Sequence, residues 1–290
     1  MIYFLFDYVI NLLYSCHLYM KRKALLVGIN KYKIPGADLN GCVNDVTNVR
    51  DILLKYFGFT TRDIRMLVDE RATKKNIING LNWLVNKASA GDCLLFHFSG
   101  HGSQVVDTDG DELKDRLDEI LCPHDMDWDG TYIVDDELRK IFETLPKGAK
   151  IEVILDSCHS GTGTREAAAI AALPRELAFK PRFLKPPADI AGRVDEEMET
   201  RKLLRNSSIQ MNCVLFAACK DNQTSADAYI KGTYNGAFTY FFCKHTRDTQ
   251  GNINRSELIK RTRASLKFEG FSQIPQLECA TSEKKKNFLQ

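Results

Sequence analysis

Two segments of the 290-residue chain carry the side chain types that cysteine peptidases use, each at the end of a predicted strand. The segment FHFSGHGSQ (96–104) contains His101, and the segment ILDSCHSGT (154–162) contains Cys158. Peptide hydrolysis by a thiol requires a thiolate, an imidazole that exchanges protons with it, and backbone N–H groups that bind the oxyanion. The two segments therefore predict a nucleophile at Cys158 and a general base at His101.

Glycine residues on both sides of His101, and Gly161 shortly after Cys158, favour this catalytic interpretation. Gly100 and Gly102 allow the chain to turn tightly and let a substrate carbonyl approach the backbone amides. The plain alternative makes Cys158 a buried thiol and His101 a turn residue. The presence of both after successive core strands, each followed by glycine, argues against that alternative. His159 is given no catalytic role, because successive residues at a strand end point in opposite directions.

The elements around these segments alternate between buried strands and amphipathic helices. Short continuous apolar runs predict strands over 23–30, 63–68, 91–100, 149–158, 212–219 and 275–280. Apolar residues at helical spacing predict helices over 44–57, 73–88, 135–145, 236–246 and 254–267. This alternation predicts an α/β fold with a mostly parallel central sheet and helices on both faces. Functional groups in such sheets gather at the carboxyl ends of the strands, where both candidates lie.

The composition excludes several classes of protein. Hydrophobic residues form 44% of the chain and charged residues 27%, which excludes disorder, collagen and coiled-coil rods. The net charge of +2 is too balanced to indicate nucleic acid as the main partner. The nine cysteines include no C-x-x-C pair, so the sequence offers no zinc ribbon or thioredoxin motif and indicates a reduced, cytoplasmic compartment.

The small net charge conceals a strongly acidic stretch. Residues 107–137 contain thirteen acids and two basic residues, a net charge of −11, which leaves +13 on the rest of the chain. Four aspartates imitate the spacing of an EF-hand loop: Asp107, Asp109, Asp111 and Asp115. Position 6 of that loop requires glycine but holds Glu112, so we interpret these residues as a solvated acidic hairpin.

The first twenty residues are mostly apolar and precede the basic cluster KRK (21–23). A secretory signal would place its positive charge first and end in small residues, and this segment does neither. Its polar residues form one stripe on a helix, and Asp7 near the middle would be costly inside a bilayer. Three interpretations stay open: a membrane anchor through residues 1–20, a helix packed on the body, and translation that begins at Met20.

Four blocks of the sequence resemble the metacaspases, the caspase-like cysteine peptidases of plants, fungi, protists and bacteria. HFSGHGSQ and DSCHSG resemble the histidine and cysteine blocks of that family. GINKYKIPGADLNGCVNDV (28–46) resembles the first-strand block, and FAACKDNQTSADA (216–228) resembles the start of the small-subunit region. The resemblance runs from about Lys23 to Ala280. The length of the 162–210 connection in this chain is closer to that of type I metacaspases than to that of type II, whose linker is far longer.

The resemblance implies one caspase-like peptidase domain over 21–290, folded as a three-layer α/β sandwich. Its parts would be a large-subunit-like region, a processing linker and a small-subunit-like region, over 21–161, 162–210 and 211–290. It further implies a monomeric thiol endopeptidase, made as a zymogen, that cleaves protein substrates after Arg or Lys. The alternative is a caspase-like scaffold or adaptor whose role does not depend on catalysis. Nothing in the sequence favours that alternative, since His101 and Cys158 are both present.

The family's pattern, carried over to this chain, makes His101 the general base and acid and Cys158 the nucleophile. The amides of Gly102 and Cys158 would form the oxyanion hole. The family's pocket for the residue before the cleaved bond is acidic, and its lining falls on Cys42, Asp45, Ser99 and Asp156. Carboxylates from different strand ends can pair with a guanidinium, whose fork suits bidentate contact. Two alternatives stay open, with Asp45 as a helix N-cap and Asp156 as a residue that orients others.

Many metacaspases need calcium, and the resemblance implies Ca²⁺ ligands at Asp118, Asp135 and Asp136. Oxygen ligands that converge from two segments suit this ion. Gap-free counting places Arg165 where the family has a further aspartate, and a cation there would weaken the site. We expect calcium to activate the enzyme. The arginine at position 165 is the observation that argues against this expectation.

The 162–210 segment is the expected site of self-cleavage. It shows no steady strand signal and contains the helix-breaking prolines of LPRELAFKPRFLKPPADIAG. Segments of this length without secondary structure are usually functional or disordered. The candidate cleavage sites are five arginines that look exposed: Arg165, Arg175, Arg193, Arg201 and Arg205.

Overall fold

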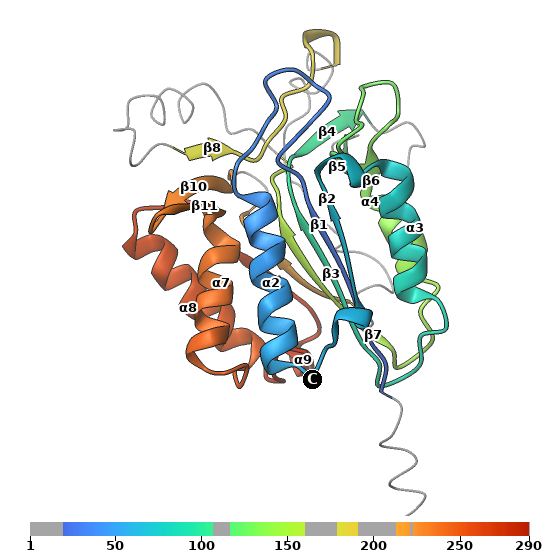
Figure 1. Cartoon of the computed structure of the whole chain (residues 1–290), viewed down its shortest axis with the longest axis vertical. Helices are drawn as coiled ribbons and strands as arrows, with labels where there is room; N and C mark the ends of the chain where they lie inside the picture. Colours follow the sequence, from blue (N-terminus) through green and yellow to red (C-terminus); the bar gives the residue numbers. More distant parts are fainter. Residues whose placement is uncertain (1–19, 107–116, 160–178, 191–212, 221–222, 290) are drawn as a thin grey trace, which may run out of the picture.

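A six-stranded sheet forms the centre of the molecule (Figure 1). The computed structural model describes residues 20–106, 117–159, 179–190, 213–220 and 223–289. The strands are β1 (Arg22–Gly28), β2 (Ile64–Val68), β3 (Cys93–Ser99), β7 (Lys150–Asp156), β9 (Cys213–Ala217) and β12 (Gln276–Glu278). Their order across the sheet is β12-β9-β7-β3-β1-β2. All neighbours run parallel except β12, which runs antiparallel to β9.

Helices cover both faces of this sheet (Figure 1). One layer consists of α2 (Cys42–Tyr56), α7 (Ala237–Asp248) and α8 (Arg255–Phe268), and the other of α3 (Lys74–Val85) and α4 (Asp135–Phe142). Successive residues of a strand point to opposite faces. In β1, Leu25 therefore belongs to the core cluster that contains Ile77 of α3, and Leu26 to the cluster that contains Val46 of α2. Burial on both faces explains why the strands are continuous apolar runs.

The register of the central strands brings their carboxyl ends to one edge of the sheet. Gly28 lies opposite Ser99, and Ser99 lies opposite Asp156, across β1, β3 and β7. The loops that follow β3 and β7 therefore begin at adjacent points. These loops contain His101 and Cys158.

Two small antiparallel sheets lie beyond this edge (Figure 1). One contains β4 (Gly102–Val106), β5 (Leu117–Leu121) and β6 (Ile133–Val134), and the other β8 (Phe179–Pro181), β10 (Ala226–Ile230) and β11 (Thr233–Gly236). A short helix, α9 (Thr281–Lys284), follows β12.

The predicted class, a mostly parallel sheet between two helical layers, is confirmed. The prediction of no strand in 162–210 was wrong for 179–181, because β8 forms through its pairing with β10. Pro181 fits there because β8 is an edge strand of its sheet. Within the described ranges, no helix is both long and apolar enough to cross a membrane. Residues 1–19 lie outside the described residues, so the three interpretations of that segment stay predictions.

Candidate active site

His101 and Cys158 are buried at the carboxyl edge of the central sheet, with 5% and 0% of their surfaces exposed. His101 stands between β3 and β4, and Cys158 follows β7 by two residues. The two loops pack so closely that a Cβ placed on Gly102 would lie 2.3 Å from the carbonyl oxygen of Cys158. Only glycine allows this approach, which explains why Gly102 stands beside His101.

The His101 ring is hydrogen-bonded to the Ala37 backbone and also interacts with the Arg182 backbone. Its Nε2 lies 2.7 Å from the carbonyl oxygen of Ala37. A carbonyl can only accept, so Nε2 carries the hydrogen and Nδ1 carries the lone pair. Nδ1 has no hydrogen-bond partner among the described residues. Burial lowers the pKa of His101 to about 4, so the ring is neutral at pH 7 and Nδ1 can accept a proton.

The Cys158 thiol faces the start of β10. The backbone N–H of Ser225 donates to its Sγ, and the Sγ of Cys219 lies 3.9 Å away. The hydrogen bond to Cys158 and burial together raise the pKa of the Cys219 thiol well above its usual range. Cys219 therefore stays protonated at neutral pH. Cys158 is the thiol that lies beside the amides predicted to form the oxyanion hole.

An acidic pocket lies beside these residues and holds a guanidinium from the same chain. Three fully or nearly fully buried carboxylates line it: Asp45 of α2, Asp156 of β7 and Asp227 of β10. The side chain of Arg182 is completely buried between them. Its nitrogens lie 2.7 Å from Asp45 Oδ2, 3.2 Å from Asp156 Oδ1 and 3.1 Å from Asp227 Oδ1. Ser99 Oγ accepts a further hydrogen bond from Arg182 at 2.8 Å.

Hydrogen bonds from other groups hold each of the three carboxylates in place. Ser99 Oγ donates to Asp45 at 2.7 Å, and the Gly236 N–H donates to the same carboxylate at 2.9 Å. Burial raises the pKa of Asp45 to about 7, while Arg182 and Ser99 act to lower it. A cation in the pocket therefore favours the ionised form of Asp45.

The other two carboxylates are held in the same way. Asp156 accepts from Ser225 Oγ at 2.6 Å and from the Thr239 hydroxyl at 2.6 Å. Asp227 accepts from the backbone N–H groups of Asn40 and Gly41, both at 2.8 Å. These fixed donors keep the carboxylates aimed at the centre of the pocket.

The four predicted lining residues are brought together around Arg182. α2 begins at Cys42 with Gly41 as its N-cap, so Asp45 is not the N-cap of this helix. Asp156 serves both as an orienting acceptor for Ser225 and as a partner of Arg182. Burial raises the pKa of the Cys42 thiol, which therefore gives the pocket a neutral wall.

The backbone around Arg182 binds the catalytic loops as an extended peptide would. The Arg182 carbonyl accepts hydrogen bonds from the N–H groups of Gly102 at 3.1 Å and Cys158 at 3.2 Å. These are the two amides that the resemblance to metacaspases predicts for the oxyanion hole. The Arg182 N–H donates to the Ser225 carbonyl at 3.0 Å, which continues the antiparallel pairing of β8 with β10. We refer to residues 179–184 as the bound segment.

Sequence reasoning did not single out Asp227 or Arg182. Asp227 lies inside a block quoted for its resemblance, and its signal is an acid within a buried strand, with 1% of its surface exposed. Arg182 stands between apolar residues in the run FKPRFL, and this is its one local signal among the several arginines and lysines of the 162–210 linker. The five arginines predicted as cleavage sites all lie outside the described residues: Arg165, Arg175, Arg193, Arg201 and Arg205.

The predicted calcium ligands lie in the sheet that begins with β4. Asp118 is in β5, and Asp135 and Asp136 begin α4. The Asp136 carboxylate forms ion pairs with Arg139 and Lys140. Burial raises the pKa of Asp135 to about 6, and the neighbouring Asp136 adds to this effect.

Within the described part of the chain, no three Asp, Glu, His or Cys side chains are grouped so as to hold a metal ion. The described carboxylates do not make up a calcium site by themselves. A site at these aspartates would need further oxygen ligands. The acids of the predicted hairpin at 107–115 lie outside the described residues. His159, which received no catalytic role, has its Nδ1 3.8 Å from Glu119 Oε2.

Comparison with known protein families and curated proteins gives consistent matches. A family model described as "Metacaspase, peptidase C14 domain" matches residues 22–165. Metacaspase-1 of Scheffersomyces stipitis is 33% identical over 90% of this chain and 71% of its own length. Metacaspase-1A of Aspergillus terreus is 34% identical over 90% of this chain and 70% of its own length.

Solved structures share the fold. A protein from Geobacter sulfurreducens superimposes with a TM-score of 0.68 at 24% identity, covering 93% of this chain and 98% of that one. Caspase-1 from Spodoptera frugiperda gives a TM-score of 0.56 at 12% identity, covering 90% of this chain and 88% of that one. These likenesses place the chain among caspase-like folds.

The His101 ring should titrate near pH 4 in the intact Cys158→Ala protein, because burial disfavours the charged imidazolium. Histidine NMR can follow this titration, with the His101→Asn variant identifying the resonance. The unfolded chain binds this proton near pH 6.5, so the free energy of unfolding should fall as the pH drops from 6.5 towards 4. A titration near 6.5 in the folded protein would contradict the described burial.

Proposed function

This chain belongs to the metacaspases, which are C14 cysteine peptidases, and we propose that it is an endopeptidase cleaving after Arg or Lys. In this proposal Cys158 is the nucleophile and His101 the general base and acid. One observation carries it: the chain's own Arg182 lies in an acidic pocket while its carbonyl accepts from the Gly102 and Cys158 amides. The arrangement resembles an arginyl substrate bound at the bond to be cut.

We propose the following reaction for these groups. Cys158 gives its proton to Nδ1 of His101, and the thiolate attacks the carbonyl carbon of the arginine. The two amides that bind the carbonyl oxygen hold the negative charge that forms on it. The bond to the next residue breaks as His101 returns the proton to the leaving nitrogen. Water activated by His101 then hydrolyses the thioester and frees Cys158.

The charge of the pocket supports the preference for basic residues. Three buried carboxylates line it, and an aspartate in the substrate would add a fourth negative charge without a counterion. A guanidinium can bind two acceptors at once through its planar fork, whereas the lysine ammonium acts as a point charge. Arginine should therefore be preferred over lysine, and aspartate should be excluded.

The Cys158→Ala variant should lose more than about a thousandfold of the activity on an Arg reporter peptide, because the attacking sulfur is gone. The Cys219→Ala variant removes the neighbouring buried thiol and should keep most of the activity. The measurement is kcat/KM on reporters that end in Arg, Lys and Asp. Equal activity of the Cys158→Ala protein would sink the mechanism, and faster cleavage of the Asp reporter would exclude the acidic pocket as the specificity site.

We further propose that the enzyme cuts its own chain between Arg182 and Phe183. The support is that Arg182 fills the acidic pocket and its carbonyl lies at the two oxyanion amides. Because the bound segment joins the two halves of the domain along the chain, this cut would separate the large-subunit-like region from the small-subunit-like region.

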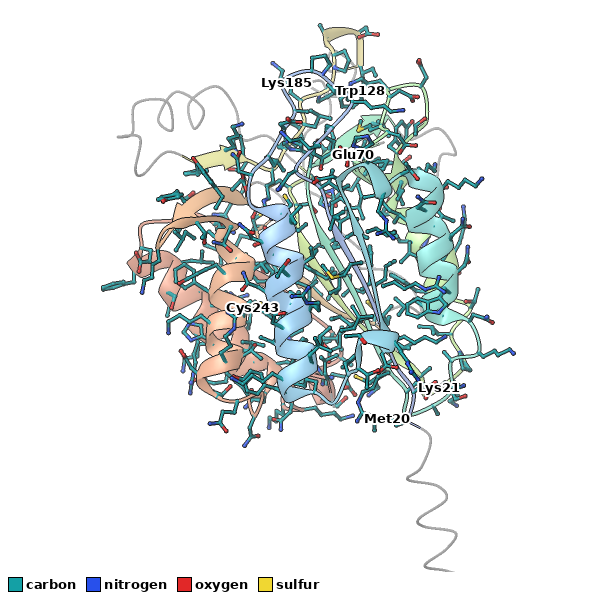
Figure 2. All side chains as sticks on the ribbon, in the orientation of Figure 1. Met20, Lys21, Glu70, Trp128, Lys185 and Cys243 are labelled. Carbon is teal, nitrogen blue, oxygen red and sulfur yellow. The ribbon has the colours of Figure 1, made fainter. Side chains whose placement is uncertain are left out.

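Intact-mass analysis should show the wild-type chain divided after residue 182 and the Cys158→Ala chain uncut. The Arg182→Gln variant should not be cut at this bond, since the pocket loses its cation. Lys185→Gln is the matched control, because Lys185 is an exposed basic residue three positions later, labelled at the top of Figure 2. A wild-type chain cut only after other arginines, with Arg182 still joined to Phe183, would contradict the assignment.

We also propose that calcium activates the enzyme through Asp118, Asp135 and Asp136 with further oxygen ligands. The support is that β5, which carries Asp118, pairs with β4, which supplies the Gly102 amide. A metal chelator should therefore lower the rate of Arg reporter cleavage several-fold, and added Ca²⁺ should restore it. The Asp135→Asn variant should need more Ca²⁺ for the same rate. An unchanged rate in chelator would refute calcium activation.

A further inference from the structure

We propose that the active site binds six residues of its substrate, with Phe271 selecting an aromatic residue three positions before the arginine. Ser103 would bind the backbone of the peptide on the other side, at the second residue after the cleaved bond. The inference rests on the proposed endopeptidase function and deepens it. It follows from the way the bound segment (179–184) contacts the protein on both sides of Arg182.

Phe179 of the bound segment packs on a separate apolar cluster. It lies opposite Ala228 in the β8–β10 register and packs against the cluster that includes Ala228, Phe241 and Leu266. The ring centroids of Phe179 and Phe271 are 6.3 Å apart at an angle of 60°. Aromatic pairs at this distance and tilt attract each other beyond the effect of apolar burial.

The position of Phe271 is fixed by the end of α8. Gly270 has a φ of +85°, which lets the chain reverse directly after the helix. The Phe271 N–H then donates to the Leu266 carbonyl at 2.9 Å. The Phe271 ring is therefore part of the folded body and is available to any peptide that takes the place of the bound segment.

The protein contacts the two residues between Phe179 and Arg182 less closely, so these positions should accept more kinds of side chain. Lys180 is exposed, and its Nζ contacts only the Asp38 carbonyl, at 3.1 Å, among the described residues. Pro181 lacks an N–H, and in an edge strand the N–H groups of alternate residues point away from the sheet. A proline at this place thus loses no strand pairing, and its fixed φ prepares the peptide for the extended shape.

The side after the cleaved bond is bound by β4. The Leu184 N–H donates to the Gly102 carbonyl at 2.9 Å, and Ser103 Oγ donates to the Leu184 carbonyl at 2.6 Å. The Leu184 side chain packs against the core cluster that contains Val105 of β4. Ser103 is itself completely buried, so its hydroxyl is held toward the peptide.

These contacts define the expected substrate class. The preferred peptide begins with an aromatic residue, accepts any residue at its second position and accepts proline at its third. Arginine follows at the fourth position, then any residue, then an apolar residue at the sixth. Cleavage occurs after the arginine. Both outer positions are recognised by groups that the acidic pocket does not contain.

The test compares internally quenched peptides on enzyme incubated until its mass is constant. The reference peptide is Phe-Lys-Pro-Arg-Phe-Leu, and its variants carry Gly or Asp in place of the first Phe, or Asp in place of Leu. We expect kcat/KM to fall about tenfold with Gly at the first position and further with Asp, because the ring contact is lost. We expect a comparable fall with Asp at the last position.

Variants of the protein then assign each effect to a residue. Phe271→Ala should bring the Phe-to-Gly ratio of kcat/KM close to one, and Phe271→Leu, which keeps the volume, should give an intermediate ratio. Phe268→Ala is the matched control, because Phe268 is 87% exposed at the end of α8, and it should leave the ratio unchanged. Ser103→Ala should slow the hexapeptide more than a reporter whose peptide ends at the arginine.

The outcomes separate this inference from the proposed function. Equal rates for all four peptides, with cleavage still after arginine, would overturn the outer subsites and leave the endopeptidase function standing. A Phe-to-Gly ratio that survives in both Phe271 variants would overturn the role of Phe271. No cleavage of any arginyl peptide would overturn both the inference and the proposed function.

Discussion

Three buried carboxylates around a single guanidinium are the constraint on which the candidate site depends. Burying an unpaired carboxylate is costly, and holding two or three together adds their mutual repulsion. The protein meets this cost with fixed donors, such as the backbone N–H groups of Gly41 and Gly236, and with Arg182. The pocket is thus arranged for a cation before any outside substrate arrives. Its walls come from α2, β7 and β10, so this one group of charges ties the two ends of the domain together.

The parallel sheet supplies the geometry that this electrostatic arrangement needs. Its register sets Ser99 and Asp156 side by side, and the chain continues from these residues to His101 and Cys158. Gly102 and Gly236 stand where a Cβ would collide, with the Cys158 carbonyl in one case and with Asp156 and Arg182 in the other. Small residues at the carboxyl edge therefore allow the acidic pocket, the Cys158 thiol and the amides of Gly102 and Cys158 to lie close together.

The sequence allowed the core and the two loops to be predicted, but not the segment that fills the site. The central strands are continuous apolar runs, so each can be recognised from its own residues without knowing which strands lie beside it. β8 has only three residues and exists through its pairing with β10. Arg182 meets Asp45 across 137 positions of the chain, and no local pattern encodes such a contact. Asp227 was not predicted for the same reason, because its partner Arg182 lies in a linker whose sequence predicts no regular secondary structure.

The attachment of the bound segment to the rest of the chain has a consequence for kinetics. A tethered ligand meets its site at an effective concentration, which for short connections is on the order of millimolar and does not change on dilution. A free peptide must compete with that local concentration. Its apparent dissociation constant is therefore its intrinsic one divided by the fraction of molecules in which the pocket is open. Lowering the enzyme concentration in an assay will not relieve this competition. A higher concentration of peptide, or a change in the chain that releases the segment from the pocket, will do so.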